Sequence, residues 1–248
     1  MVWLLQDKLL ELLADETSYP YVFMYGSNGN GGLWKSRNVP AKYSDNFLET
    51  LPIAADNPVA YATVEKYVGN VVQYVQEKKV GLFFFSKPCP ENRFGTGTGK
   101  TTAAVTILNH YLLERLRQHL KGEQAIKDNP VYFCKSTDLQ TAFNAQFRGT
   151  PEMQRVASER YYAIKNRAKA VELLVFDDIA TKASTESFTE ELYEIIDHRA
   201  SEELATIYTS NMTMEAVADL LGDRIASRIE GMTVPVAFSG ADHRKKVL

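Results

Sequence analysis

A glycine-rich segment constrains the fold of this chain more than any other feature of its sequence. Residues 95–102 read Gly-Thr-Gly-Thr-Gly-Lys-Thr-Thr and lie between the apolar run 81–85 and a long helical pattern. A strand, a glycine-rich turn ending in lysine and threonine, and a helix form the layout of a phosphate-binding loop. Glycines let backbone N–H groups approach phosphate oxygens, and the helix directs the positive end of its dipole at the anion. The segment predicts a nucleotide bound by Gly95, Thr96, Gly97, Thr98, Gly99, Lys100, Thr101 and Thr102.

Two of these residues have side chains suited to separate tasks. Lys100 can reach the outer phosphates, and the Thr101 hydroxyl can hold Mg²⁺. One position departs from the usual pattern, which has glycine where this chain has Phe94. An aromatic ring there could cover the nucleotide or wedge the loop, which leaves the rate of hydrolysis open. Because Gly97, Gly99 and Lys100 are retained, nucleotide binding is expected to survive.

The bulk composition limits the remaining possibilities. The chain has 248 residues, and we expect a small N-terminal appendage at 1–40 and one main domain at 41–248. The net charge of -3 means that any nucleic-acid contact must come from a local basic patch. Two cysteines, Cys89 and Cys134, indicate reduced thiols rather than a zinc site. With no apolar run of membrane-spanning length and no secretory signal, we expect a cytoplasmic protein that makes no membrane contact.

Apolar spacing along the chain predicts strands that alternate with helices. The segments expected to be helical are 3–13, 57–79, 101–120, 138–147, 151–170, 186–199, 214–221 and 222–229. The expected strands are 81–85, 130–135, 173–176, 205–209 and 234–238, and the aromatic segment 19–25 also has a strand-like pattern. Pro235 favours an edge position for the last strand. This alternation predicts an α/β fold in which helices sandwich a parallel sheet.

Two carboxylates directly follow one of the predicted strands. The apolar residues 173–176 precede Asp177 and Asp178. Because ligands of open α/β sheets bind at the carboxyl ends of the strands, both acids are expected beside the phosphate loop. We expect Asp177 to hold Mg²⁺, directly or through water, and Asp178 to orient or deprotonate an attacking water. The combination predicts ATP and Mg²⁺ as the cofactors.

A polar amide follows the next strand and allows two interpretations. Asn211 comes shortly after the strand predicted at 205–209. Its side chain could touch the terminal phosphate of a nucleotide or the water that attacks it. Alternatively, Asn211 or Thr213 could cap the helix that begins at Met214, and from this segment alone the cap is the simpler interpretation.

Two arginines near the C-terminus also allow two interpretations. Arg224 and Arg228 are spaced so that they share one helical face. They could project across a subunit boundary onto a neighbour's nucleotide, as an arginine finger does. Alternatively, they could lie on a solvated helix and pair with Asp223 and Glu230.

These signals, taken in this order, resemble one family. The chain is similar to the bacterial or phage replicative-helicase loaders of the DnaC/DnaI type, AAA+ ATPases whose family includes the IstB transposition ATPases. The initiator DnaA is a more distant relative. The resemblance covers roughly residue 39 to the C-terminus and rests on residues 97–101, 173–178, 209–211 and 223–228. The glycine-rich loop is generic, whereas the last two segments are more specific in combination.

The resemblance implies a P-loop NTPase fold of the AAA+ type, ATPase activity and a role for each matching residue. Because the chain ends soon after the last predicted strand, no C-terminal lid domain is expected, as in the loaders. The implied catalytic residues are Asp178, Asn211, Arg228 and Arg224. By position, Lys100 and Thr101 look like Walker A, Asp177 and Asp178 like Walker B, Asn211 like sensor 1, Arg228 like the arginine finger and Arg224 like a second interface arginine.

Two departures from the family pattern bear on hydrolysis. Residues 87–94 form an insert before the glycines that most of the family lacks. Asp178 stands where many AAA+ proteins carry glutamate, and its shorter side chain is expected to position water less well.

A basic segment is the candidate nucleic-acid contact. Residues 148–169 carry an excess of positive charge inside an acidic chain, with Tyr161 and Tyr162 among the cations. Cations mixed with aromatics are typical of single-strand-binding surfaces, and in the loader family an extra helix before Walker B faces the DNA. The alternative is a solvated amphipathic helix whose tyrosines face the core. The candidate contacts are Arg148, Arg155, Arg160, Lys165, Arg167 and Lys169.

These expectations define one leading hypothesis and two alternatives. The leading hypothesis is an ATP-dependent helicase loader that forms a homo-oligomer through its arginine finger and contacts single-stranded DNA and a replicative hexameric helicase. An IstB-like ATPase that assists a transposase would have the same fold, so only the partner distinguishes it. A stand-alone P-loop enzyme would need a substrate pocket with acceptor groups, and the paired arginines and missing lid argue against it.

Overall fold

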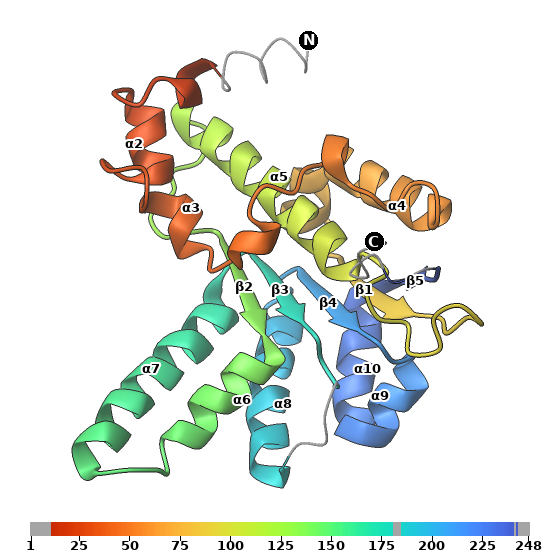
Figure 1. The fold of residues 1–248 in the computed structure, drawn as a ribbon. Helices are drawn as coiled ribbons and strands as arrows, with labels where there is room; N and C mark the ends of the chain where they lie inside the picture. The colour runs from red at the N-terminus through yellow and green to blue at the C-terminus, as the bar shows by residue number, and fades with distance from the viewer. Residues whose placement is uncertain (1–10, 181–184, 241, 243–248) are drawn as a thin grey trace, which may run out of the picture.

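The computed structural model describes residues 11–180, 185–240 and 242, in which helices surround a central sheet (Figure 1). The helices are α2 (Tyr19–Tyr25), α3 (Gly32–Ser36), α4 (Pro58–Gly69), α5 (Lys100–Leu120), α6 (Ser136–Ala145), α7 (Pro151–Ala170), α8 (Glu186–Ser201), α9 (Met214–Leu221) and α10 (Asp223–Met232). The strands are β1 (Gly81–Ser86), β2 (Val131–Lys135), β3 (Leu173–Asp177), β4 (Thr206–Ser210) and β5 (Thr233–Phe238). Short helical turns occur at η1 (Ala41–Tyr43), η2 (Leu48–Thr50) and η3 (Gln73–Glu77).

The strands pair in parallel in the order β2-β3-β4-β1-β5. Since β4 lies between β3 and β1, the carboxyl ends of these three strands meet at one edge of the sheet. Strand β5 is an edge strand that pairs with β1, and its Pro235 lies opposite Phe83. The predicted parallel α/β fold and the edge position of the last strand are both confirmed. The topology therefore gathers the glycine-rich loop, Asp177 and Asn211 on one side of the sheet.

Helices cover both faces of the sheet because buried side chains alternate along each strand. Phe84 and Val175 pack into a cluster with α4 and α5. Phe83 and Phe176 point the other way, into a cluster formed with helices α6 to α10. Figure 1 shows these two layers above and below the strands. Within the described ranges, none of the helices combines the length and the apolar character needed to cross a membrane.

The aromatic segment 19–25 is the helix α2, so the predicted strand is wrong. Aromatic residues favour strands only weakly, and local capping outweighs that preference here. The Ser18 hydroxyl accepts a hydrogen bond from the Tyr21 backbone N–H, and Pro20 lies in the first turn, where proline suits a helix. Gly26, with φ of 77°, ends the helix by donating its N–H to the Val22 carbonyl.

The N-terminal elements pack on the C-terminal half of α5. Met24 and Leu33 are buried in the same cluster as the core of the sheet. The Phe23 ring stacks on His119 with centroids 4.9 Å apart, and the Tyr19 hydroxyl lies 3.0 Å from the His119 Nε2 atom. The amphipathic helix predicted at 3–13 lies mostly outside the described residues, although 11–14 are helical. The division into an appendage at 1–40 and a domain at 41–248 stays a prediction.

Candidate functional site

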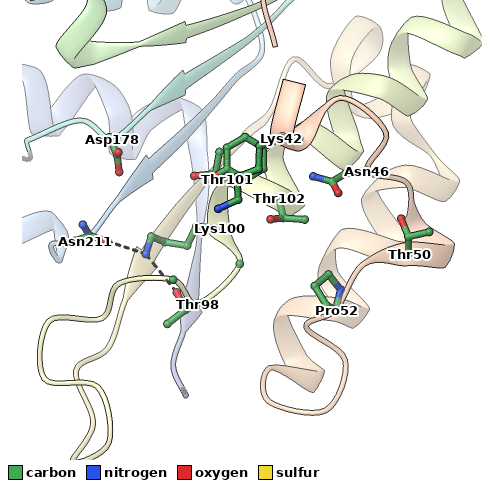
Figure 2. A pocket seen from close by; sticks show the side chains of 13 residues that line it. Lys42, Asn46, Thr50, Pro52, Thr98, Lys100, Thr101, Thr102, Asp178 and Asn211 are labelled. Atoms are coloured by element: carbon green, nitrogen blue, oxygen red, sulfur yellow. Dashed lines mark hydrogen bonds between the residues drawn. The ribbon is translucent and has the colours of Figure 1, made fainter. Parts of the chain in front are cut away.

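The carboxyl edge of the sheet contains an open cavity of about 250 Å³. One wall consists of residues 97–102, which lead from the glycine-rich loop into α5. Asp178, after β3, and Asn211, after β4, also line this cavity. Figure 2 shows the Lys100, Asp178 and Asn211 side chains on one side of the cavity. The topology thus brings together the loop, one carboxylate and the amide that the sequence singled out.

Two glycines of the loop are required by the backbone and by close packing. Gly99 has φ of 94°, and a Cβ atom at this position would lie 2.3 Å from the Ile53 Cγ2 atom. Gly95 has φ of 59°, and its Cβ would lie 2.3 Å from the Ser86 Cβ atom. Other residues would be strained in this conformation and would also collide with these neighbours. The loop shape therefore depends on glycine at both positions.

Lys100 is buried and points its ammonium group at oxygen atoms around the loop. Its Nζ atom lies 2.5 Å from the Ser86 Oγ and 3.1 Å from the Gly95 carbonyl oxygen. It also lies 2.9 Å from the Asn211 Oδ1 (Figure 2). The N-cap position of α9 is Thr213, so the Asn211 side chain faces Lys100 rather than capping that helix. The lysine and the amide are therefore neighbours in one site, although they are far apart in the sequence.

Asp177 and Thr101 form the candidate metal site. The Asp177 Oδ1 atom accepts hydrogen bonds of 2.8 Å from both the Thr101 and the Thr209 hydroxyls. Burial raises the pKa of Asp177 to about 6, and the adjacent Asp178 carboxylate adds to this shift. A carboxylate held mainly by neutral hydroxyls is costly to ionise, and a nearby cation would remove that cost. Carboxylate and hydroxyl oxygens are hard ligands of the kind that Mg²⁺ prefers, so this pair fits that ion.

Asp178 occupies an unusual backbone conformation beside the cavity. It has φ of 56°, and Ala180 has φ of 57°, both in the left-handed region. The Asp178 backbone N–H donates to the Thr209 hydroxyl at 2.9 Å, and its carboxylate lies 3.9 Å from the Lys135 Nζ atom. Left-handed backbone at non-glycine residues tends to occur at functional sites. The conformation turns the chain so that Asp178 lines the cavity after the buried Asp177.

The insert at 87–94 is fastened to the loop by one asparagine. The Asn92 Nδ2 atom donates to the Thr96 carbonyl at 2.7 Å, and its Oδ1 atom accepts from the Thr96 N–H at 3.2 Å. Phe94, in contrast, is 82% exposed and lies outside the set of residues that line the cavity. Its ring therefore neither covers the cavity nor wedges the loop in this structure.

The two candidate finger arginines lie on α10, apart from the cavity of their own chain. The Arg228 Nε atom donates to the Asp197 carboxylate of α8 at 2.7 Å. The Arg224 guanidinium lies over the Tyr193 ring at 4.0 Å. Neither arginine lines the cavity. Both arginines are exposed at the surface where α8 and α10 pack together.

Three cations of the basic segment are engaged by carboxylates of the same chain. Arg155 forms ion pairs with two glutamates of its own helix. Lys165 is buried, with its Nζ atom 2.6 Å from Glu191 and 2.5 Å from Glu194. Lys169 lies 2.9 Å from Glu194 as well. The contacts of Lys165 and Lys169 fasten α7 to α8, and the pairs of all three cations neutralise much of the local charge.

The rest of the basic segment presents a different surface. Tyr161 is buried, whereas Tyr162 is 52% exposed. The Arg167 guanidinium lies 4.8 Å from the centre of the Tyr132 ring. Arg148 and Arg160 are exposed, and within the described ranges neither forms a side-chain ion pair. Of the candidate cations in this segment, Arg148 and Arg160 are therefore the ones most available to a ligand.

The sequence did not reveal several residues that shape the site. Ser86 holds Lys100 and directly follows strand residues that looked like core. Thr209 belongs to a segment that the sequence singled out, but its hydrogen bond to Asp177 was not expected. Lys42, Asn46 and the turn near Thr50 form the wall of the cavity opposite Asn211. The sequence signal for this wall was weak, because the segment lies about fifty residues before the loop.

The fold is of the α/β class, with a five-stranded parallel sheet covered by helices, and it is similar to the AAA+ P-loop domains of known replication proteins. The crystal structure of the DnaC helicase loader aligns with a TM-score of 0.56 at 22% identity, covering 80% of this chain and 99% of that chain. The replication initiator DnaA bound to AMPPCP and single-stranded DNA aligns with a TM-score of 0.53 at 20% identity, covering 80% of this chain and 51% of that chain. These likenesses confirm the predicted fold class.

The chain is also similar in sequence to a curated replication protein. The replicative helicase loader DnaC of Escherichia coli strain K12 is 27% identical over 187 residues, which are 74% of this chain and 61% of that loader. The chain therefore spans less than two thirds of the length of this relative. No family model matches the chain. The resemblance to helicase loaders expected from the sequence is confirmed by these similarities.

Proposed function

We propose that the chain is an ATP-dependent loader that places a replicative DNA helicase on single-stranded DNA in the cytoplasm. The observation that carries this proposal is the convergence of Lys100, Asp177 and Asn211 with the glycine-rich loop at one edge of the sheet. Similarity to the DnaC loader supports the choice of partner. The remaining functional roles follow from the positions of individual side chains.

The glycine-rich loop and α5 would bind the phosphates of ATP. Backbone N–H groups at the start of α5 form an anion site because the first turn of a helix leaves them without helical partners. Lys100 would exchange its contacts with Ser86 and Asn211 for phosphate oxygens. Thr101 and Asp177 would hold Mg²⁺, which neutralises phosphate charge when bound. Asp178 and Asn211 lie where they could orient an attacking water.

Hydrolysis would require a second copy of the chain. Arg224 and Arg228 lie outside the cavity of their own chain, so they can reach a nucleotide only across a subunit boundary. An arginine finger stabilises the negative charge that develops on the transferred phosphoryl group. In this proposal Arg228 leaves Asp197 when a neighbouring subunit with bound ATP docks. The ATPase activity would therefore depend on oligomer formation.

Single-stranded DNA would lie along the exposed face of α7. Arg148 and Arg160 supply positive charge, and the half-exposed Tyr162 supplies a ring on which a base could stack. The aligned DnaA is bound to single-stranded DNA, which supports this assignment by analogy of fold. Because the contacts are to backbone phosphates and base faces, binding should not depend on DNA sequence.

The partner can be identified by affinity capture from the native host in the presence of ATP and Mg²⁺. We expect the full chain to recover a replicative hexameric helicase, and we expect Lys100→Ala, which should not bind ATP, to recover much less of it. Lys66→Ala, at an exposed position on α4, is the matched control and should behave as the wild type. Recovery of a transposase in place of a helicase would overturn the loader assignment and favour an IstB-like role.

A further inference from the structure

The insert between β1 and the glycine-rich loop has a definite shape of its own. Cys89 and Asn92 pair through two backbone hydrogen bonds, of 3.2 and 3.0 Å, which close a tight turn. Pro90 is the second residue of this turn, a position that suits the fixed φ of proline. The Lys87 backbone N–H donates to the carbonyl of Phe238, the last residue of β5, at 2.7 Å. The insert is therefore tied to the edge strand of the sheet before it reaches the loop.

The Asn92 side chain joins the insert to two other segments. It is buried, and its Nδ2 atom donates to the Thr96 carbonyl at 2.7 Å and to the Gly240 carbonyl, beyond β5, at 3.1 Å. Its Oδ1 atom accepts from the Thr96 N–H at 3.2 Å. The Asn92 backbone carbonyl also accepts from the Gly95 N–H at 3.1 Å. One asparagine therefore fixes the first two residues of the glycine-rich loop.

Thr96 is consequently held through each of its polar groups. Asn92 engages its backbone N–H and carbonyl, and its hydroxyl donates to the Asp242 carboxylate at 3.2 Å. Gly97 follows directly and packs on the same carboxylate, because a Cβ atom at Gly97 would lie 1.6 Å from the Asp242 Oδ1. The position of the start of the loop is thus set by residues from outside the glycine-rich segment.

A loop of this composition needs such support because it is costly to order. Gly95, Gly97 and Gly99 have φ values of 59°, 68° and 94°, and glycine loses more conformational freedom on ordering than any other residue. The end of the loop is fixed by α5, which begins at Lys100. The start of the loop has no such helix, and Phe94, which stands where the usual pattern has glycine, is exposed. Contacts from the insert therefore replace secondary structure at this end.

We propose that Asn92 is a positioning residue that holds the glycine-rich loop in its phosphate-binding shape before a nucleotide arrives. This inference rests on the proposed binding of ATP at the loop. Asn92 does not line the cavity, so it acts through the peptide groups of Thr96 rather than by touching phosphate. When only a fraction of the molecules has the competent shape, the apparent dissociation constant rises in inverse proportion to that fraction. Loss of Asn92 should therefore slow association and leave dissociation unchanged.

The first test is stopped-flow binding of ATP that carries a fluorophore on its ribose, in the presence of Mg²⁺. In Asn92→Ala the association rate constant should fall about tenfold, the size expected for the net loss of one or two hydrogen bonds. The dissociation rate constant should stay the same, because the contacts with the bound nucleotide are kept. Phe94→Ala, in the same insert but with a ring that is 82% exposed, is the matched control and should keep both rate constants.

Hydrogen exchange without nucleotide reports the shape of the loop directly. The acceptor of the Gly95 N–H is the backbone carbonyl at position 92, which the substitution retains. In Asn92→Ala the Gly95 amide should nevertheless exchange about tenfold faster, because local opening of the loop becomes easier, whereas the amides of α7 should not change. Asn92→Asp keeps the size of the side chain but removes both donated bonds, and it should give the same pattern.

The outcomes separate this inference from the proposed function. Unchanged exchange at Gly95, faster exchange throughout α7 as well, or faster dissociation with unchanged association would overturn the positioning role of Asn92 while ATP binding at the loop stands. Failure of the wild type to bind ATP would instead overturn the proposed function, and the positioning role with it.

Discussion

Two carboxyl groups of this chain have pKa values shifted in opposite directions, and the contrast separates the functional site from the scaffold. Asp177, at the end of β3, is held by the hydroxyls of Thr101 and Thr209, and burial raises its pKa to about 6. Glu194, on α8, accepts hydrogen bonds from Lys165 and Lys169, which lower its pKa below the usual value. The first carboxylate lies in a setting that disfavours its charge, whereas the second has cations supplied by its own chain.

This difference shows which charges the fold satisfies by itself. The ion pairs between α7 and α8 need no ligand, and they account for much of the basic character that the sequence displays at 148–169. At the carboxyl edge of the sheet, the environment of Asp177 disfavours its negative charge. This is expected where a bound cation, rather than a residue of the chain, neutralises the carboxylate. Local clusters of charge in a sequence are therefore a weaker guide to function than buried charge at a ligand-binding edge.

The largest effect is expected for Arg228. Its partner Asp197 resembles Glu194, because its negative charge is paired with a cation of the same chain. Arg228→Ala should lower the rate of ATP hydrolysis on the order of a thousandfold, the usual effect of losing an arginine finger. The affinity of the monomer for ATP should stay the same, because Arg228 does not line the cavity. Steady-state hydrolysis and equilibrium titration measure the two quantities. Arg117→Ala, which breaks a surface ion pair on α5, is the control. Unchanged hydrolysis in Arg228→Ala would mean that this arginine has only a structural role.

A smaller effect is expected on stability from Asp177→Asn in the absence of Mg²⁺. Folding raises this pKa from 3.8 to about 6, so the folded protein binds the proton more tightly than the unfolded chain does. The ionised carboxylate is therefore destabilising at pH 7, and the variant should raise the free energy of unfolding there by about 3 kcal/mol. Denaturant unfolding at several pH values measures this gain, which should shrink as the pH falls from 7 toward 5.

The matched control for this prediction is Glu194→Gln on the other side of the comparison. Because Glu194 is half-exposed and ion-paired, its loss should lower the free energy of unfolding at pH 7 by less than about 1 kcal/mol. Opposite signs for the two variants would support the contrast. A loss of stability in both variants would mean that Asp177 is an ordinary structural carboxylate.

The smallest effect is expected in the basic segment. Arg148→Ala combined with Arg160→Ala should weaken binding of single-stranded DNA about tenfold and lower the slope of its salt dependence by about 1.4, or about 0.7 for each phosphate that is no longer neutralised. Arg155→Ala should have a weaker effect, because two glutamates already engage that guanidinium. Titration of a labelled oligonucleotide at several salt concentrations measures both quantities. An equal loss of affinity in all of these variants would indicate a diffuse charge effect, and unchanged affinity would remove the DNA-binding role of α7.

Sequence patterns predicted the parts of this molecule that depend on neighbouring residues. The glycine-rich loop and the two acids at the end of β3 are contiguous motifs, and the alternation of strands and helices follows from local apolar spacing. The strand predicted at 19–25 was wrong because the capping residues Ser18 and Gly26 decide the conformation, and the aromatic pattern does not reveal them. Predictions from local patterns were therefore correct where the pattern itself contained the residues that decide the conformation.

The contacts between distant side chains that complete the site could not be predicted in this way. Lys100 meets Asn211 only because β1 and β4 are neighbours in the sheet, and Asn46 is held by Asn109 from a helix that starts at the loop. Asn92 could not be assigned a role because the path of the insert is set by contacts with Thr96. Such contacts join side chains whose proximity follows from topology and packing rather than from spacing in the sequence.

The central claim is that this edge of the sheet binds ATP through Lys100, and equilibrium titration with ATP and Mg²⁺ tests it most directly. The wild type and Lys66→Ala should both show saturable binding of one ATP per chain. Lys100→Ala should abolish that binding while its thermal melting in the absence of nucleotide still shows a folded protein. Equal ATP affinity in Lys100→Ala and the wild type, or no saturable binding by the wild type, would contradict the account.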